Sequence, residues 1–579
     1  MRMRRGWIGL GWGLFLAMAP CSMFGAETAD LIFTHGKIIT VDEAFSIADS
    51  MAIRGDRILA VGQEEDVKSY RGSQTEWIDL KGKALMPGLI DSHAHPADAC
   101  LTEFDHPVPD METIADVLNF IRERARALPE GKWIFVSQVF LTRLEEGRYP
   151  TRAELDAAAP RHPTVFRTGP DASVNTLALQ RSGIDKNFKV TDGGPGYAEK
   201  DAATGEPTGI LRSCTRVLKY VSPEKQPMEE EHAAKLKELF ADYNRVGLTA
   251  VGERDASWGE IALYQRLQER DELNLRAYVS LHVDTIQPIE EMEKEIIKVR
   301  RHPLYEGVGL VQLRTVKTYL DGGMLTGSAY MREPWGVSAF YNISDPQYRG
   351  VLFIDPDKLV AILDACMKHD VQYTAHSVGD GAVHTFLDAC NSLQSRYDIR
   401  AKRPVICHSN FMSAEAVETA ARLGVAMDLQ PAWLYLDSRT LLQQFGQERM
   451  RWFQPLRSLF AAGAIAGGGS DHMQKIGSMR SINFYNPWMG MCVAMTRQAH
   501  WVEKPIHPEE ALSRVEALRF YTINNAYLQF AEHERGSLEP GKLADFIILK
   551  EDPLTCPVDH IKTMEVEETY VGGRRVYAN

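Results

Sequence analysis

The ten residues from Pro87 to Pro96, PGLIDSHAHP, set the first expectation for the fold of this 579-residue chain. An apolar run ends there in two histidines, His93 and His95, separated by a single alanine. On a β-strand, residues i and i+2 point to the same side, so both imidazoles would project together, as two ligands of one metal ion must. Two buried structural histidines would show the same pattern, and the pair alone leaves both interpretations open.

Strand-like runs that end in polar residues recur further along the chain. VQYTAH ends at His376, RPVICH ends at His408 and AGAIAGGGSD ends at Asp471, and helix-like segments alternate with these runs. This alternation predicts parallel strands with crossover helices. Polar groups at the carboxyl ends of successive strands are typical of a barrel. We therefore predict an α/β fold with a (β/α)8 TIM-type barrel over residues 88–530.

Other segments depart from this rhythm. Residues from about 97 to 245 fit it poorly, and we predict that they form a large insertion over the active-site face of the barrel. Short alternating strands with glycine-marked turns occur at both ends of the chain, over residues 30–87 and 536–579. Neither piece is large enough to fold alone, so we predict one small composite β-sandwich domain built from residues 27–87 and 531–579.

The first 26 residues resemble an export signal. Arg2, Arg4 and Arg5 precede an uncharged apolar run from Trp7 to Ala19, which is followed by small residues. This is the pattern of a secretory signal peptide over residues 1–26, and it predicts an exported, periplasmic protein. An uncleaved anchor is the alternative, and paired arginines leave a twin-arginine route open. The seven cysteines beyond this segment are scattered without a CxxC pair, which does not describe a disulfide framework.

Composition narrows the range of partners. The formal charge of −13 argues against nucleic acid and against anionic membranes beyond the export signal. We expect a small-molecule substrate, and the sequence leaves open whether the chain forms a homo-oligomer.

Five side chains at strand ends form a candidate metal site: His93, His95, His376, His408 and Asp471. Four imidazoles and a carboxylate suit zinc or a similar divalent ion. Each residue alone also has an ordinary structural explanation, but a common metal site explains all five together.

Five motifs in order are similar to those of the amidohydrolase superfamily: PGLIDSHAHP, VKTYLDGG, AHSVGDGAV, CHSNF and GGGSDH. The nearest branch contains N-substituted formamide deformylases and exported metal-dependent hydrolases. The resemblance implies that Lys317 is carboxylated by CO2 and bridges two divalent metal ions, Zn²⁺ being expected. It places His93, His95 and Asp471 around one ion and His376 and His408 around the other. The alternative for Lys317 is an ion pair with Asp321 or with a substrate carboxylate.

This site predicts hydrolysis. Two such ions lower the pKa of a shared water and polarise a carbonyl, and Asp471 can accept the proton of the attacking hydroxide and pass it to the leaving nitrogen. The resemblance implies cleavage of a C–N bond other than a peptide bond in a small amide-like substrate. A lactonase or phosphoesterase on the same site is the alternative, and a non-catalytic binding protein on this fold is a third interpretation.

One motif departs from the branch. The segment TGPDASVNTLAL, residues 168–179, lacks the histidine that the branch usually has there, and that segment faces the substrate in the family. Our substrate-pocket candidates are Asp171, Asn175, Met324, Trp335, Gln430 and Trp433, with ordinary packing as the alternative for the aromatic residues. Glu253 could line the cavity or form a core salt bridge. We leave His472 and His282 out of the metal set.

Overall fold

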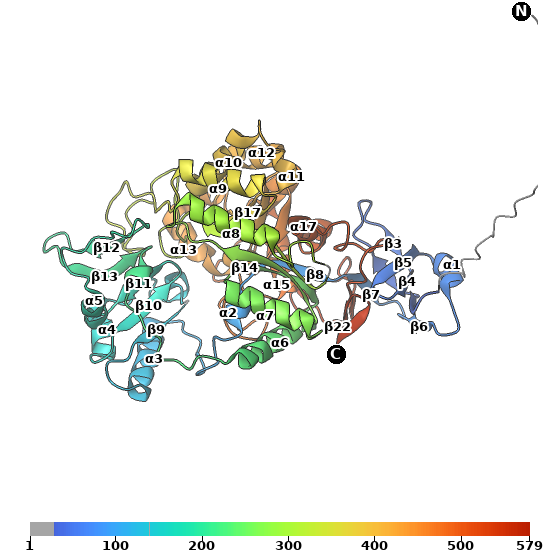
Figure 1. The fold of residues 1–579 in the computed structure, drawn as a ribbon, viewed down its shortest axis with the longest axis horizontal. Coiled ribbons are helices and arrows are strands. Elements are labelled where there is room, and N and C mark those ends of the chain that lie inside the picture. Colours follow the sequence, from blue (N-terminus) through green and yellow to red (C-terminus); the bar gives the residue numbers. More distant parts are fainter. Residues whose placement is uncertain (1–27, 138, 308) are drawn as a thin grey trace, which may run out of the picture.

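The computed structural model describes residues 28–137, 139–307 and 309–579. The predicted signal peptide, residues 1–26, lies outside the described residues. In the described part of the chain, no helix combines the length and apolar character that a membrane crossing requires. Figure 1 shows a central barrel, an insertion on its left and a small sheet domain on its right.

The central sheet has eight parallel strands and forms a nearly closed barrel, as the sequence predicts. Around the barrel the strands are β8 (Leu89–Ala94), β14 (Leu248–Ala256), β15 (Arg276–His282), β16 (Val311–Tyr319), β17 (Gln372–Ser377), β18 (Val405–His408), β19 (Ala426–Leu429) and β20 (Ala466–Gly468). Helices such as α9 (Pro356–Lys368), α10 (Asp380–Leu393) and α12 (Ala414–Leu423) cover its outer face (Figure 1). Parallel strands bring all their carboxyl ends to one rim, where polar side chains can meet.

The barrel closes between β8 and the segment that follows β20. Asp471 N donates to His93 O at 2.7 Å, and His95 N donates to His472 O at 2.8 Å. The side chain of Asn525 adds two bonds from Nδ2, to Ile90 O at 2.5 Å and to Gly468 O at 2.7 Å. The two predicted histidines and Asp471 therefore lie on the seam itself.

The glycine run 467–469 serves this closure. A Cβ on Gly467 would lie 2.0 Å from Asn525 Oδ1, and one on Gly468 would lie 2.6 Å from the ring of Phe520. One on Gly469 would lie 2.8 Å from the backbone nitrogen of His93. Protein atoms therefore fill the space beside all three glycines, and the run leaves no room for a bound group at these positions.

Replacing Gly468 with alanine is expected to lower the free energy of unfolding by about 1–3 kcal/mol, because the methyl group overpacks against Phe520 and Tyr521. The control is Gly259→Ala in α7 (Trp258–Glu269), where the nearest outside atom would be at 3.7 Å and alanine favours the helix. Thermal unfolding of both variants checks this. Equal midpoints for the two variants would contradict the packing argument.

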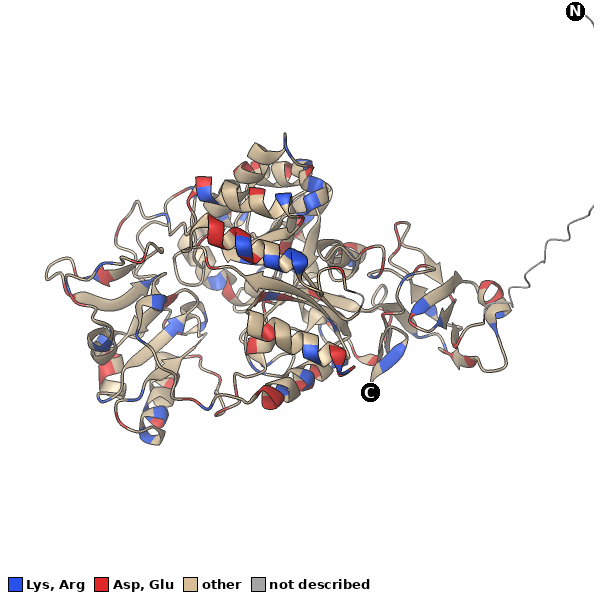
Figure 2. Cartoon of the chain, viewed as in Figure 1, with Lys and Arg blue, Asp and Glu red and all other residues tan. Residues whose placement is uncertain are grey.

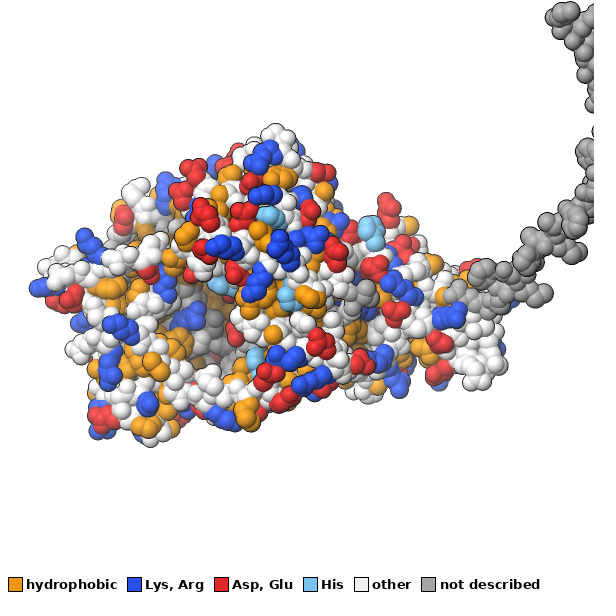
Figure 3. All heavy atoms as spheres, viewed as in Figure 1, with side chains coloured by type: hydrophobic (Ala, Val, Ile, Leu, Met, Phe, Trp, Pro, Cys, Tyr) orange, Lys and Arg blue, Asp and Glu red, His pale blue; other side chains and the backbone are white. Residues whose placement is uncertain are grey.

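The insertion has a sheet of its own. Its strand order is β12 (Tyr197–Lys200), β13 (Pro207–Arg212), β11 (Asp171–Val174), β10 (Thr164–Thr168) and β9 (Ile134–Val136). Helices α3 (Ile114–Ala127), α4 (Arg152–Ala158) and α5 (Thr176–Ser182) accompany it. The helix α6 (Glu229–Arg245) instead packs its buried side chains into the barrel core. On the face seen in Figure 3, the surface is hollowed between the insertion and the barrel.

Both ends of the chain build the sheet domain. One sheet has the order β5 (Arg57–Gly62), β4 (Ser50–Arg54), β1 (Leu31–Thr34) and β6 (Glu76–Asp79). The other has the order β23 (Arg574–Ala578), β22 (Val566–Val571), β21 (Phe546–Leu549), β7 (Ala84–Pro87), β2 (Lys37–Ile39) and β3 (Ile47–Ala48). Antiparallel pairing of β7 with β21 joins the termini, and Phe33, Leu85 and Phe546 share one core. The exact domain boundaries stay predictions.

Charged residues are dispersed over this architecture. Figure 2 shows basic and acidic residues interspersed along the helices around the barrel. The overall negative charge is therefore not concentrated on one face of these helices.

Candidate metal centre

Three of the predicted ligands form a tight cluster at the barrel seam. One ligand atom of each of His93, His95 and Asp471 lies within 4.8 Å of the others. Asp471 Oδ1 is 3.2 Å from His95 Nε2 and 3.6 Å from His93 Nε2. His93 and Asp471 are buried. One carboxylate and two imidazoles at these distances can surround a single divalent ion.

The environment of His93 supplies a test of this fit. Its Nδ1 donates to Asp428 Oδ2 at 3.0 Å, whereas its Nε2 is buried and has no hydrogen-bond partner in the described part of the chain. A buried imidazole nitrogen without a partner is costly unless a ligand completes it. An imidazole held by a carboxylate through its other nitrogen is the usual arrangement of a metal-binding histidine. The residues present therefore fit a metal ion.

His376 and His408 lie beside this cluster. Their ring centroids are 4.6 Å apart, and the ring of His408 is 4.7 Å from that of His93. His408 Nδ1 donates to Gln430 Oε1 at 2.8 Å, and the ring stacks on Trp433 at 4.7 Å and 12°. These contacts fix the ring of His408 and leave its Nε2 for the cavity.

Lys317 lies in the same cavity and is 1% exposed. In the described part of the chain, no hydrogen bond or ion pair engages its Nζ, and the nearest recorded aromatic contact is Tyr319, 5.5 Å from the ring centroid. The alternative ion pair with Asp321 is not formed, because Asp321 accepts from the backbone nitrogens of Tyr330, Val378 and Gly379. An ammonium group buried without a counter-ion is costly, so an unmodified lysine fits this position poorly.

Electrostatics keep most of these imidazoles neutral. Burial is the main cause that lowers the pKa of His376 to about 3 and the pKa of His93 well below its usual value, and the positive charge of an unmodified Lys317 adds to it. Burial and His376 lower the pKa of His408 in the same direction. Burial opposes the charged form of His95 as well, but its hydrogen bond to Asp471 raises its pKa to about 8. Neutral imidazoles are the form that binds metal ions.

Backbone strain gathers at the same rim. His408 has φ 77° and Asp471 has φ 54°, both in the left-handed region that non-glycine residues seldom occupy. Asp255, at the end of β14, has φ 103°. Such strain costs of order 1–3 kcal/mol per residue and is concentrated at functional sites.

All six predicted ligands line one cavity of about 340 Å³: His93, His95, Lys317, His376, His408 and Asp471. Among the pocket candidates, Met324 and Trp433 also line it. The other four, Asp171, Asn175, Trp335 and Gln430, do not belong to its lining, and each has a structural role instead.

Three of these four residues are bound to protein groups outside the cavity, which corrects the pocket prediction for them. Asp171 pairs with Arg212 inside the insertion, with 3.2 Å between Asp171 Oδ2 and Arg212 Nη1. Asn175 caps α5 by accepting from Ala178 N at 2.9 Å. Trp335 donates from Nε1 to Ala329 O and packs on Phe445.

Gln430 hydrogen-bonds to a predicted metal ligand and does not line the cavity. Its Nε2 donates to Asp428 Oδ1 at 2.9 Å, while its Oε1 accepts from His408. Asp428 also accepts from Ser92 Oγ at 2.7 Å. Sequence reasoning missed Asp428, although a carboxylate two residues before Gln430 in an apolar strand was a usable signal.

The segment 168–179 does reach the cavity, but through other residues. Gly169 and Pro170 form the turn between β10 and β11 and line the cavity, as does Arg167. Sequence reasoning missed Arg167, and its position in the chain gave no signal. It also missed Asp255 and Tyr319, which are hydrogen bonded to each other at 2.8 Å.

The structure shows the contacts of three further residues whose roles the sequence did not decide. His472 has both ring nitrogens bonded to protein, to Tyr243 Oη and to the carbonyls of Gln474 and Lys475. Glu253 is a core residue that accepts from Tyr264 Oη at 2.8 Å, and burial raises its pKa to about 8. His282 lines the cavity and donates to Asp255 at 2.6 Å.

Comparison with known proteins identifies the family of the chain. The model of the amidohydrolase family matches residues 76–577. YtcJ of Bacillus subtilis (strain 168) is 26% identical over 94% of this chain and 99% of its own length. The N-substituted formamide deformylase of Arthrobacter pascens is 26% identical over 94% of this chain and 98% of its own length.

A solved structure shares the fold. An uncharacterized metal-dependent hydrolase from Pyrococcus horikoshii OT3 has a TM-score of 0.65 and 20% identity, over 92% of this chain and 99% of its own. Since the family match extends over most of the sequence and includes all six clustered residues, this chain is a member of the amidohydrolase family.

Proposed function

We propose that this protein is a metal-dependent hydrolase that cleaves a C–N bond other than a peptide bond in a small amide-like substrate. The observation that carries the proposal is the buried, unpartnered Nε2 of His93 beside His95 and Asp471 in a cavity of about 340 Å³. That volume suits a small molecule. The bond type is supported by the family and by the name of the formamide deformylase relative.

The metal complement is part of the proposal. Two divalent ions, Zn²⁺ by preference, would be held by His93, His95 and Asp471 on one side and by His376 and His408 on the other, with carboxylated Lys317 between them. When bound, such ions supply Lewis-acid activation of a water molecule and of the scissile carbonyl.

The protein's own groups supply the remaining chemistry. Asp471 Oδ1 lies 3.2 Å from His95 Nε2, at the centre of the cluster, where it can take a proton from the attacking water and return it to the leaving nitrogen. Asp428 and Gln430 hold His93 and His408 in fixed orientations. Apolar side chains such as Phe140, Met324 and Trp433 limit the water around the substrate.

The test is a panel of formamides, acetamides, lactones and phosphoesters assayed with zinc-loaded protein and with protein stripped of metal by a chelator. We expect amide turnover that requires metal and returns when Zn²⁺ is restored. Faster turnover of lactones or phosphoesters would show that the cleaved bond is an ester bond and not a C–N bond. Metal-independent turnover would reject the proposal.

The location of the protein is also part of the proposal. We expect the protein in the periplasm after removal of residues 1–26, as a monomer or a homo-oligomer acting on a small-molecule substrate.

A further inference from the structure

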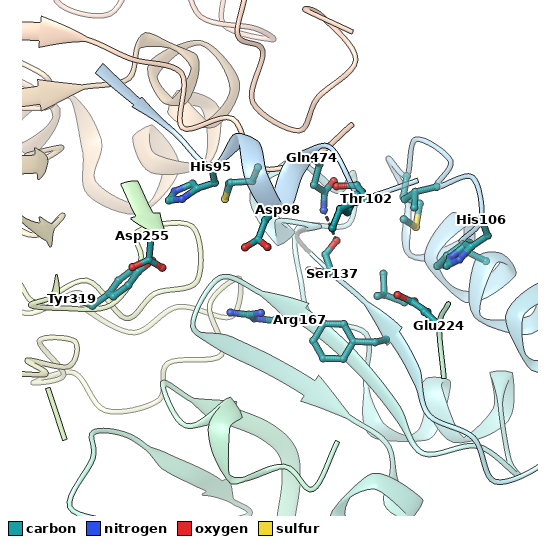
Figure 4. Close-up of a pocket in the computed structure, with 17 residues that line it drawn as sticks. His95, Asp98, Thr102, His106, Ser137, Arg167, Glu224, Asp255, Tyr319 and Gln474 are labelled. Carbon is teal, nitrogen blue, oxygen red and sulfur yellow. Dashed lines mark hydrogen bonds between the residues drawn. The ribbon is translucent and has the colours of Figure 1, made fainter. Parts of the chain in front are cut away.

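A second cavity adjoins the metal centre. It has a volume of about 390 Å³ and shares His95, Arg167, Tyr319 and Met473 with the cavity that contains the predicted ligands. Figure 4 shows Arg167 reaching from the insertion into this space, across from Asp98 and toward Tyr319 and Asp255. Arg167 therefore lies where the two cavities meet.

Among the described residues, the guanidinium of Arg167 has no counter-ion. Its Nε donates to Gly169 O at 3.0 Å, which fixes the group against the turn of its own hairpin. In the described part of the chain this is the sole hydrogen bond of the side chain, and it forms no ion pair. Burial lowers the pKa of Arg167. The two terminal nitrogens thus face the cavity as a preorganised fork.

The carboxylates that face Arg167 are engaged elsewhere. Asp255 accepts from His282 Nδ1 at 2.6 Å and from Tyr319 Oη at 2.8 Å. Burial, followed by the charge of Glu260, raises the pKa of Asp98 to about 6, so this carboxyl group is partly neutralised near neutral pH. Glu224, which also lines the second cavity, forms no ion pair with Arg167 either. Arg167 is half-buried, so its charge is partly withdrawn from water. A guanidinium held there with no ion pair to the described residues is available to an incoming anion.

We propose that Arg167 binds a carboxylate of the substrate, so that the enzyme acts on small molecules that carry a carboxylate a short chain away from the cleaved C–N bond. This inference rests on the proposed hydrolase function. The planar guanidinium matches a carboxylate in two-point contact. Asp98 and Asp255 in the same wall repel any anion, and they oppose a singly charged carboxylate less than a phosphate dianion.

The experiment uses a series of ω-formamidoalkanoates of increasing chain length, each paired with its primary carboxamide, which has the same shape without the charge. Isothermal titration calorimetry with zinc-loaded protein measures binding, and turnover is measured in parallel. We expect at least one chain length at which the carboxylate binds about tenfold more tightly than its carboxamide, or about 1.4 kcal/mol. We expect Arg167→Gln to abolish this preference and Arg167→Lys to retain part of it.

The matched control is Arg216→Gln. Arg216 lines the metal-centre cavity too, but its guanidinium is already paired with Asp192, through two contacts of 3.0 Å. This variant should keep the carboxylate preference, and it shows whether loss of any cavity arginine would give the same result. Circular dichroism and the metal content confirm that both variants are folded and loaded.

Three results would overturn the assignment of Arg167. They are equal binding of carboxylate and carboxamide at every chain length, a preference that survives in Arg167→Gln, and no carboxylate binding up to about 10 mM, the millimolar limit of useful affinity. Hydrolysis of the carboxamides without a carboxylate preference would reject only this inference. Carboxylate binding through Arg167 without hydrolysis of any amide would reject the proposed function, but the assignment of Arg167 as a carboxylate-binding residue would stand.

Discussion

Replacing Asp471 with asparagine is expected to lower kcat for the best amide substrate by about 10²–10⁴-fold, the usual contribution of a general acid–base group. Asparagine keeps the shape of the side chain and an oxygen near His95, but its amide does not accept the proton of the attacking water. The residue is held in a left-handed conformation by its bond from N to His93 O, and Asn483 donates to its carbonyl at 2.8 Å. Asparagine tolerates this conformation, so the backbone should persist.

The measurement combines steady-state kinetics with the metal content per chain. If Asp471→Asn retains its metal and loses turnover, the carboxylate acts in proton transfer. If metal and turnover fall together, its first role is to hold the ion. Asp201→Asn, an exposed turn carboxylate in the insertion that accepts from Thr204 N, is the control and should leave kcat unchanged. Full activity in Asp471→Asn would contradict both roles.

The barrel rim was the most predictable part of the molecule. His93, His376 and His408 each lie at or near the carboxyl end of a parallel strand, and barrel topology brings such ends to one rim whatever lies between them. The alternation of side chains along a strand and the alternation of strands with helices therefore predicted that residues more than three hundred positions apart share one cavity. Lys317 was added by resemblance to the family, since its spacing alone carried no sign of a ligand.

The insertion was the least predictable part. Its sheet packs over the rim in an orientation that no periodicity encodes, so Arg167 could not be assigned to the cavity from the sequence. The sequence assigned the hairpin that carries Arg167 only to the insertion, and Asp171 and Asn175 serve the insertion's own folding. Which face of a hairpin meets the barrel depends on the exact turn, here Gly169 and Pro170, and a small shift in register exchanges the two faces.

The residues that hydrogen-bond to the predicted ligands were partly predictable from the sequence. Asp428 lies in β19 and Gln430 directly follows the strand, with Leu429 between them. Two polar residues at this spacing beside a buried strand need hydrogen-bond partners, which they find in neighbouring strands. The partners are His93 for Asp428 and His408 for Gln430. They can be identified only when strands β8, β18 and β19 are assembled into one sheet.

Replacing Lys317 with alanine is expected to reduce the bound metal from about two equivalents per chain to about one or fewer, and to lower kcat/KM by about 10³-fold or more, because a two-metal site depends on its bridging ligand. The physical reason is the charge at this position. An unmodified ammonium, 1% exposed and with no ion pair to any described residue, repels cations, whereas a carbamate provides two oxygens and a negative charge. Metal analysis by mass spectrometry and steady-state kinetics measure both effects.

Three further measurements separate a carbamate from an ordinary lysine. Protein expressed with ¹³C-bicarbonate should show a carbamate carbon resonance that Lys317→Ala lacks. Lys317→Glu, which restores a carboxylate on a shorter chain, should regain part of the metal content, whereas Lys317→Arg should not, since arginine stays cationic. Thermal unfolding of each variant excludes loss of the fold as the cause. A fully loaded and active Lys317→Ala would show that the two imidazoles of His376 and His408 hold their ion without a bridge, and the carbamate would have to be abandoned.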